Sequence, residues 1–323
     1  MMRKFRPKIS AASVVGCLGS SILLTGCTIG APTSTDDEES ALGTSTVTIT
    51  SSATAFDTSN PTRVLESTVE PEPVQTTTSA TAQPNTDDIA SQMQLAVDNA
   101  VSVYGGSAGI ALSDGYTSVT AGDMTPYASW STIKVPIAIA ALRNDPSQLA
   151  NVTAAIQWSD NAAAETLWGS LGAPEEAGLV TEGVLAEGGV QVPVSTVVTR
   201  EGFSSFGQTM WAASDQARFA ANLACIPGSE PILQNMAQIE PSQSWGIGGL
   251  PQAQFKGGWG PEPNGSYSAR QFGLTTDPAT GQSRALAIIV RPGSGNFNDA
   301  QMMANALISE VQSVIPQSPP TSC

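Results

Sequence analysis

The sequence predicts an α+β fold, an α/β/α sandwich in which helices cover one antiparallel sheet and an all-helical subdomain is inserted into the chain. Strand-like segments occur in two groups, within residues 107–120 and 254–291. A helical pattern precedes the first group and another follows the second, while residues 146–258 are mostly helical in spacing. The two groups of strands must therefore meet in one sheet, and the cleft beside the inserted helices is a favoured place for a small-molecule site.

The N-terminal part of the domain is predicted to be a helix followed by a β-hairpin. Asp88 is the expected N-cap, and apolar residues follow it at helical spacing: Ile89, Met93, Leu95, Ala96 and Ala100. Residues 107–112 and 116–120 are the expected strands, because Ser113-Asp114-Gly115 between them is a turn signal.

A helix over residues 131–143 comes next, and Pro136 lies near enough to its first turn to be tolerated. Ser214, with Asp215 in the first turn, is the expected N-cap of a later helix. The helices expected beyond residue 146 span residues 149–158, 162–171, 174–187, 214–225 and 230–239.

Strand character returns near the C-terminal end of the chain. The expected strands cover residues 254–256, 269–275 and 284–291, with a turn at 277–281 between the last two. A closing amphipathic helix is predicted over residues 298–315, with one apolar side formed by Met302, Ala306, Leu307, Val311 and Val314.

The charge balance of the chain excludes one class of function. Thirteen Lys and Arg residues stand against 28 Asp and Glu, a net charge of −15. Nucleic-acid binding depends on Lys and Arg displacing counterions from phosphates. We therefore expect no DNA or RNA partner.

The N-terminus resembles a bacterial lipoprotein signal peptide. Four cationic residues among the first eight precede a small and apolar run, residues 9–26, which ends in Leu24-Thr25-Gly26-Cys27. The resemblance implies that residues 1–26 are removed, that Cys27 carries lipid, and that the mature protein is anchored to the outer face of the cell membrane. A transmembrane helix is the alternative, but the run is short and broken by glycine and serine.

The remaining chain divides by composition. Residues 27–86 are rich in Ser, Thr and Pro without an apolar period, which predicts a disordered linker after the lipidated cysteine. Residues 87–316 form the expected folded domain, and residues 317–323 a C-terminal tail. With Cys17 removed and Cys27 lipidated, Cys225 and Cys323 are left either to form a disulfide in an oxidising exterior or to remain unpaired thiols.

A serine and a lysine are the first candidates for catalysis. Ser131 and Lys134 are three positions apart at the start of a helical run, so their side chains share one face. The chain contains no histidine, and only two lysines, Lys134 and Lys256, lie outside its first ten residues. A serine nucleophile here must use a base other than imidazole. Alternatively, Ser131 only starts a helix and Lys134 pairs with a carboxylate.

Two further motifs follow in order, Ser159-Asp160-Asn161 and Lys256-Gly257-Gly258. Together with Ser131-x-x-Lys134, this series resembles the penicillin-recognising serine hydrolases, most closely the class A β-lactamases. The resemblance covers roughly residues 88–315 and implies a split sheet with an inserted helical subdomain. Taken alone, Ser-Asp-Asn before an alanine-rich helix could also be a simple helix cap.

The resemblance implies a role for each matching residue. Ser131 is the implied nucleophile, Lys134 its proton acceptor and Ser159 a proton relay. Lys256 would attract a substrate carboxylate and help keep Lys134 neutral. Asn161 would bind a substrate amide, and the region of Gly258 and Trp259 would bind substrate, with the backbone N–H groups of Ser131 and Trp259 forming an oxyanion hole.

The sequence departs from the family pattern in three places. Gly257 replaces the family's hydroxyl residue, which helps hold the substrate carboxylate. The loop that carries the family's deacylating glutamate has Glu201 directly after Arg200, so Glu201 is either a displaced equivalent or a salt-bridging loop residue. The 28 positions from Ser131 to Ser159 are fewer than in the β-lactamases, which predicts a trimmed helical subdomain.

Two functions follow from this pattern. The first is a membrane-anchored serine hydrolase that acts through an acyl-serine on a β-lactam, or on a peptidoglycan-type amide or ester. The alternative is a non-catalytic lipoprotein that binds a cell-wall ligand or partner through the same cleft, and a minor third reading is an envelope spacer. We expect a monomer, with no cofactor and no metal.

Overall fold

The computed structural model describes residues 85–323. The predicted signal peptide (1–26), the lipidated Cys27 and nearly all of the predicted linker lie outside these residues and stay predictions. Within the described part of the chain, no helix has an apolar stretch long enough to span a membrane.

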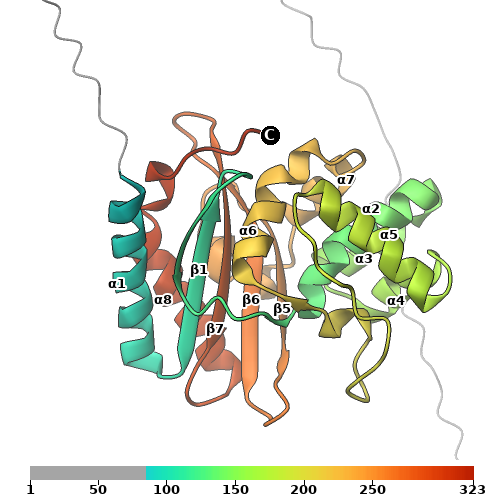
Figure 1. The fold of residues 1–323 in the computed structure, drawn as a ribbon, viewed down its shortest axis with the longest axis horizontal. Coiled ribbons are helices and arrows are strands. Elements are labelled where there is room, and N and C mark those ends of the chain that lie inside the picture. Colours follow the sequence, from blue (N-terminus) through green and yellow to red (C-terminus); the bar gives the residue numbers. More distant parts are fainter. Residues whose placement is uncertain (1–84) are drawn as a thin grey trace, which may run out of the picture. The chain divides into compact units, whose positions relative to one another are not determined.

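One five-stranded antiparallel sheet forms the centre of the domain (Figure 1). Strands β1 and β7 lie side by side, with Ile110 opposite Ile288, so the two ends of the domain meet as predicted. The strands in sheet order are β2 (Ser118–Gly122), β1 (Ser107–Ser113), β7 (Ser283–Arg291), β6 (Tyr267–Thr276) and β5 (Gln254–Pro261).

Helices cover both faces of this sheet. Helices α1 (Thr86–Tyr104) and α8 (Phe297–Val311) pack against each other and on one face, and α6 (Ala213–Asn222) packs on β1, β6 and β7 (Figure 1). Seven consecutive residues of β7 are buried, although neighbouring residues in a strand point to opposite faces. The core therefore fills both sides of the sheet, which confirms the predicted α+β sandwich.

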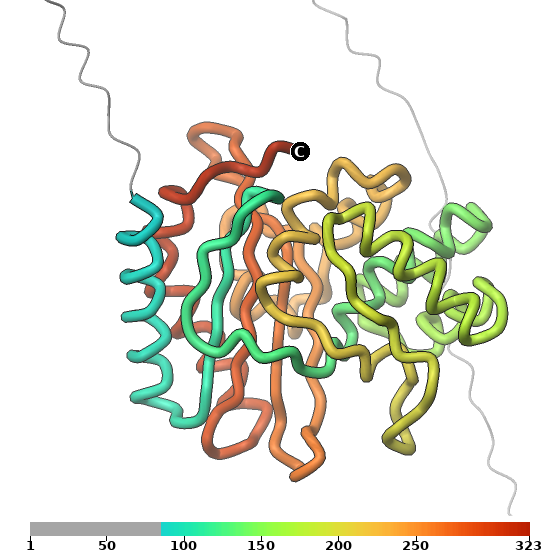
Figure 2. The backbone as a smooth tube through the Cα atoms, in the orientation of Figure 1, coloured from blue at the N-terminus to red at the C-terminus, as the bar shows by residue number. Residues whose placement is uncertain are grey.

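The chain leaves the sheet after β2 and returns to it at β5 (Figure 2). Most of the intervening helices form the inserted helical part, but α6 belongs to the layer on the sheet. The inserted helices are α2 (Lys134–Asn144), α3 (Leu149–Gln157), α4 (Asn161–Gly169), α5 (Pro174–Glu187) and α7 (Glu230–Met236).

Several short elements were not predicted from the sequence, because each is too short to show a repeating helical or strand pattern. A two-stranded sheet pairs β3 (Tyr127–Ala128) with β4 (Met210–Trp211). Single 3-10 turns are η1 (Trp130–Ile133), η2 (Pro146–Gln148), η3 (Phe206–Gln208), η4 (Leu223–Cys225), η5 (Pro241–Gln243), η6 (Gly246–Gly249) and η7 (Ile315–Gln317).

Two predicted helix caps were wrong. Asn85, and not Asp88, caps α1, because the Asn85 side chain accepts a hydrogen bond from the Asp87 N–H at 3.3 Å while its backbone is extended. Ser214 lies inside α6, whose N-cap position is taken by Ala212 without a side-chain hydrogen bond. Both helices begin earlier than predicted.

Two residues assigned to apolar helix faces are exposed. Leu95 on α1 is 61% exposed and Met302 on α8 is 46% exposed, whereas the residues that directly follow them, Ala96 and Met303, are buried. The helical period fits either neighbour, and the direction in which each helix packs decides between them. The second hairpin strand is also shifted, from residues 116–120 to Ser118–Gly122.

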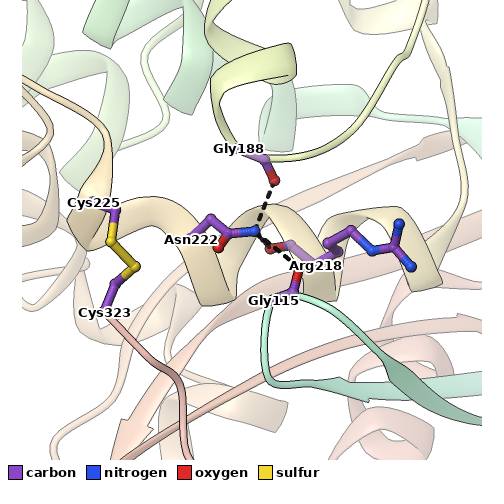
Figure 3. The surroundings of a disulfide bond; sticks show 6 residues. All are labelled: Gly115, Gly188, Arg218, Asn222, Cys225 and Cys323. Atoms are coloured by element: carbon purple, nitrogen blue, oxygen red, sulfur yellow. Dashed lines mark hydrogen bonds between the residues drawn. A yellow bond between two sulfur atoms is a disulfide. The ribbon is translucent and has the colours of Figure 1, made fainter.

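The structure joins Cys225 and Cys323 in a disulfide (Figure 3). The two residues are 98 positions apart in sequence with 5.5 Å between their Cα atoms. Beside the bond, the Asn222 amide donates to the carbonyls of Gly115 and Gly188 at 3.3 and 3.2 Å (Figure 3). The tail is thus tied to the turn that follows α6, and the entropy of closing a loop of about 100 residues in the unfolded chain stabilises a fold by about 4–5 kcal/mol.

Candidate active site

Ser131 lies in η1, between the sheet and the inserted helices. The predicted helix at this residue is a 3-10 turn, and the α-helix proper begins at Lys134. Side chains three apart eclipse in a 3-10 turn, so Ser131 and Lys134 share a face. Both line one cavity of about 240 Å³. Trp130, directly before the serine, has φ of 49°, a left-handed backbone that is costly for a tryptophan.

A buried arginine holds the segment that leads to this turn. Arg270 on β6 is 1% exposed, and burial lowers its pKa to about 9, so it remains charged at neutral pH. Its guanidinium donates to the carbonyls of Tyr127 and Ala128 at 2.9 and 3.1 Å and to that of Trp211 at 2.6 Å. One cation therefore binds both strands of the small sheet, and one of these strands, β3, leads directly into η1.

Gln216 extends this network to the turn itself. Its side-chain oxygen accepts from Arg270 at 2.8 and 3.1 Å, and its amide nitrogen donates to Thr132 Oγ1 at 2.8 Å. Thr132 Oγ1 in turn donates to the Ser129 carbonyl at 2.5 Å. These buried bonds position the backbone on both sides of Ser131.

Lys134 is 2% exposed and donates three hydrogen bonds to the Ser-Asp-Asn segment. The acceptors are the carbonyls of Ser159 and Asp160 at 2.6 and 3.2 Å and Asn161 Oδ1 at 2.8 Å. Burial lowers the pKa of Lys134 to about 8, against the opposing effect of nearby Asp160 and Glu165. Among the hydrogen bonds of the described residues, none joins Lys134 to Ser131 Oγ.

Lys256 on β5 is fully buried beside the same segment. Its ammonium donates to Ser159 Oγ and to the Gly257 carbonyl, each at 2.9 Å. Burial, and then the charge of Lys134, lower the pKa of Lys256 well below the ordinary lysine value. The electrostatic effect thus acts mainly on Lys256, whereas the pKa of Lys134 is lowered chiefly by burial. A bound anion would favour the charged form of both.

The Ser-Asp-Asn segment joins the two lysines and also starts α4. Asp160 Oδ1 accepts from the Ala163 N–H at 2.7 Å, so the motif is a helix cap as well as a bridge between Lys134 and Lys256. Ser159 has φ of 58°, a second strained residue at the site. Asn161 lines the cavity with Ser131.

The edge of β5 closes another side of the site. A Cβ placed on Gly258 would lie 2.8 Å from the N–H nitrogen of Ser131, so only glycine allows this approach. At Gly257 an added Cβ would be in ordinary contact with Trp259, Gln271 and Trp245, so a hydroxyl residue would fit there. Trp259 stacks on Phe297, with ring centroids 5.2 Å apart, and lines the cavity without filling it.

Aromatic residues of the loop after residue 200 form another part of the cavity wall. Phe203 packs edge-on against Trp130 at 5.4 Å, and the Arg200 guanidinium lies over both rings. Phe206 also lines the cavity. Glu201 is exposed and does not line the cavity. Glu165 on α4 is also exposed, but it does line the cavity.

Three residues of the site were not predicted from the sequence: Arg270, Gln216 and Glu165. The spacing of Asn161 and Glu165, four apart on one helix, could have placed the glutamate on the cavity side. No local signal distinguishes Arg270, because its partners come from segments more than 50 residues away.

The fold defined by this sheet and inserted helical part is that of the class A β-lactamases. The enzyme of this class from Bacteroides cellulosilyticus DSM 14838 aligns over 71% of this chain and 99% of its own, with a TM-score of 0.60 and 14% identity. The class A enzyme from Mycobacterium abscessus aligns over 69% of this chain and 99% of its own, with a TM-score of 0.55 and 14% identity. A β-lactamase from Streptosporangium roseum aligns over 71% of this chain and 100% of its own, with a TM-score of 0.54 and 14% identity. No family model and no curated protein matches the sequence.

Proposed function

We propose that this protein is a serine hydrolase that forms an acyl-enzyme on Ser131 with a β-lactam, or with a cell-wall amide or ester. One observation carries the proposal. Hydrogen bonds through Ser159 connect Lys134 and Lys256, and Lys134 lines a single cavity with Ser131. The β-lactamase-like fold supports the same class of chemistry.

Each residue has a step in the proposed reaction. Neutral Lys134 accepts the Ser131 Oγ proton as this oxygen attacks the acyl carbon. The N–H groups of Ser131 and Trp259 stabilise the oxyanion. Ser159 Oγ passes its proton to the leaving nitrogen and takes a proton from the Lys256 ammonium along their hydrogen bond, so that Lys134 ends the step charged and Lys256 neutral. Asn161 binds the substrate amide, and Lys256 attracts a substrate carboxylate without help from a hydroxyl at Gly257.

Mass spectrometry of the intact protein tests the proposal. We expect a fluorescent penicillin or an activated ester to add one acyl group to the wild type, mapped to Ser131, and Ser131→Ala to remain unlabelled under the same conditions. Thermal unfolding of Ser131→Ala beside the wild type controls for loss of structure. Failure of both probes to label Ser131 would overturn the proposal.

A non-catalytic binding protein is the second candidate. It is favoured by the three hydrogen bonds of Lys134, all of which go to the Ser-Asp-Asn segment. In that case the wild type binds a cell-wall fragment reversibly and forms no adduct, and Ser131→Ala binds it equally well. The labelling experiment therefore separates the two functions.

We also propose that Cys27 anchors the protein to the outer face of the cell membrane as a monomer. The support is the Leu24-Thr25-Gly26-Cys27 sequence after a cationic and apolar leader. Cell fractionation should recover the full chain with membranes and Cys27→Ser mostly in soluble fractions. Equal membrane recovery of both proteins would contradict lipid anchoring at Cys27.

A further inference from the structure

A second carboxylate faces the cavity of the nucleophile. Glu165 lies on α4 and lines the cavity together with Ser131, Lys134 and Asn161. It follows Asn161 by four residues, so both side chains lie on one face of the helix. Asn161 Oδ1 is 2.8 Å from Lys134 Nζ, which places that face against the lysine.

The environment of Glu165 suits a base that works on water. No hydrogen bond within residues 85–323 engages its carboxylate, and the residue is exposed to solvent at the cavity. Partial burial raises the pKa of Glu165, and the charge of Lys134 opposes this effect. Glu201, in the loop expected to carry the deacylating group, lies outside the cavity lining.

We propose that Glu165 is the general base that activates water to release the acyl group from Ser131. The inference rests on the proposed serine hydrolase function and assigns its second half-reaction to α4. The Glu165 carboxylate takes a proton from water, and the water oxygen bonds to the acyl carbon. The bond from that carbon to Ser131 Oγ then breaks, and Ser131 Oγ receives the proton that Glu165 had taken. The product is a free carboxylic acid, which ionises in solvent.

The test follows the decay of the acyl group on full-length protein. Wild type and Glu165→Gln are labelled with the fluorescent penicillin, freed of excess probe, and sampled by intact-protein mass spectrometry. We expect acylation rates within about threefold of each other, and an adduct on Glu165→Gln that decays at least about a hundredfold more slowly. Glu165→Asp should recover part of the decay rate.

Two further variants sharpen the result. Glu175→Gln removes an exposed carboxylate from α5 and should decay like the wild type. Slow decay in Glu201→Gln with normal decay in Glu165→Gln would assign the base to the loop and overturn the inference. A wild-type adduct as stable as that of Glu165→Gln would also overturn it while leaving acylation of Ser131 intact. Absence of any adduct on the wild type would instead refute the proposed function.

Discussion

Replacing Lys134 by arginine is expected to lower the rate of Ser131 acylation by about 10²–10⁴-fold, the usual contribution of a general base. Arginine keeps a positive charge and can donate to the carbonyls of Ser159 and Asp160, but it does not lose its proton at accessible pH. Acylation of Ser131 in Lys134→Ala should be at least as slow as in Lys134→Arg. The measurement is the time course of labelling by fluorescent penicillin.

The pH dependence of the wild type provides a second readout of the same role. Only neutral lysine accepts a proton, and the pKa of Lys134 is about 8. Its neutral fraction, and with it the acylation rate, should rise about tenfold from pH 7 to pH 9 and level off above that. This rise should be absent in Lys134→Arg.

Thermal unfolding of both variants shows whether a slow rate reflects lost structure. A folded Lys134→Arg protein that is acylated within threefold of the wild type would rule out Lys134 as the base. An acylation rate of the wild type that does not change between pH 7 and pH 9 would lead to the same conclusion.

The second large effect is on stability. Arg270→Met is expected to lower the free energy of unfolding by about 3–5 kcal/mol. The methionine fills much of the volume but leaves the carbonyls of Tyr127, Ala128 and Trp211, as well as Gln216 Oε1, without their donor. Urea unfolding followed by tryptophan fluorescence measures this difference.

Arg143→Met is the matched control for this measurement. Arg143 forms an ion pair with Glu187 at 2.6 Å on the surface, where solvent screens the charges, so its loss should cost at most about 1 kcal/mol. Arg270→Lys keeps the charge but loses the planar guanidinium. Its loss of unfolding free energy should lie between those of Arg270→Met and Arg143→Met. Equal unfolding energies for Arg270→Met and Arg143→Met would show that the buried network does not hold the fold.

The fold followed from patterns that are local in sequence. The strand segments near Ile110 and Ile288 are apolar enough to be buried on both faces, and their partners follow from the need to close one sheet. Element boundaries were less certain, since capping depends on the backbone angles of single residues such as Asn85. The face of a helix is also ambiguous by one position, as exposed Met302 beside buried Met303 shows.

Local patterns in the chain were enough to predict the α+β class and the candidate residues for catalysis, because a chain without histidine and with two lysines in its domain offers few bases. The arrangement of these groups depends on the packing of distant segments. This packing directs Lys134 to the Ser-Asp-Asn segment, buries Lys256 completely, excludes Glu201 from the cavity lining and places Glu165 within it. Each of these positions depends on hydrogen bonds and packing between segments that are far apart in sequence. A local sequence pattern therefore cannot predict them.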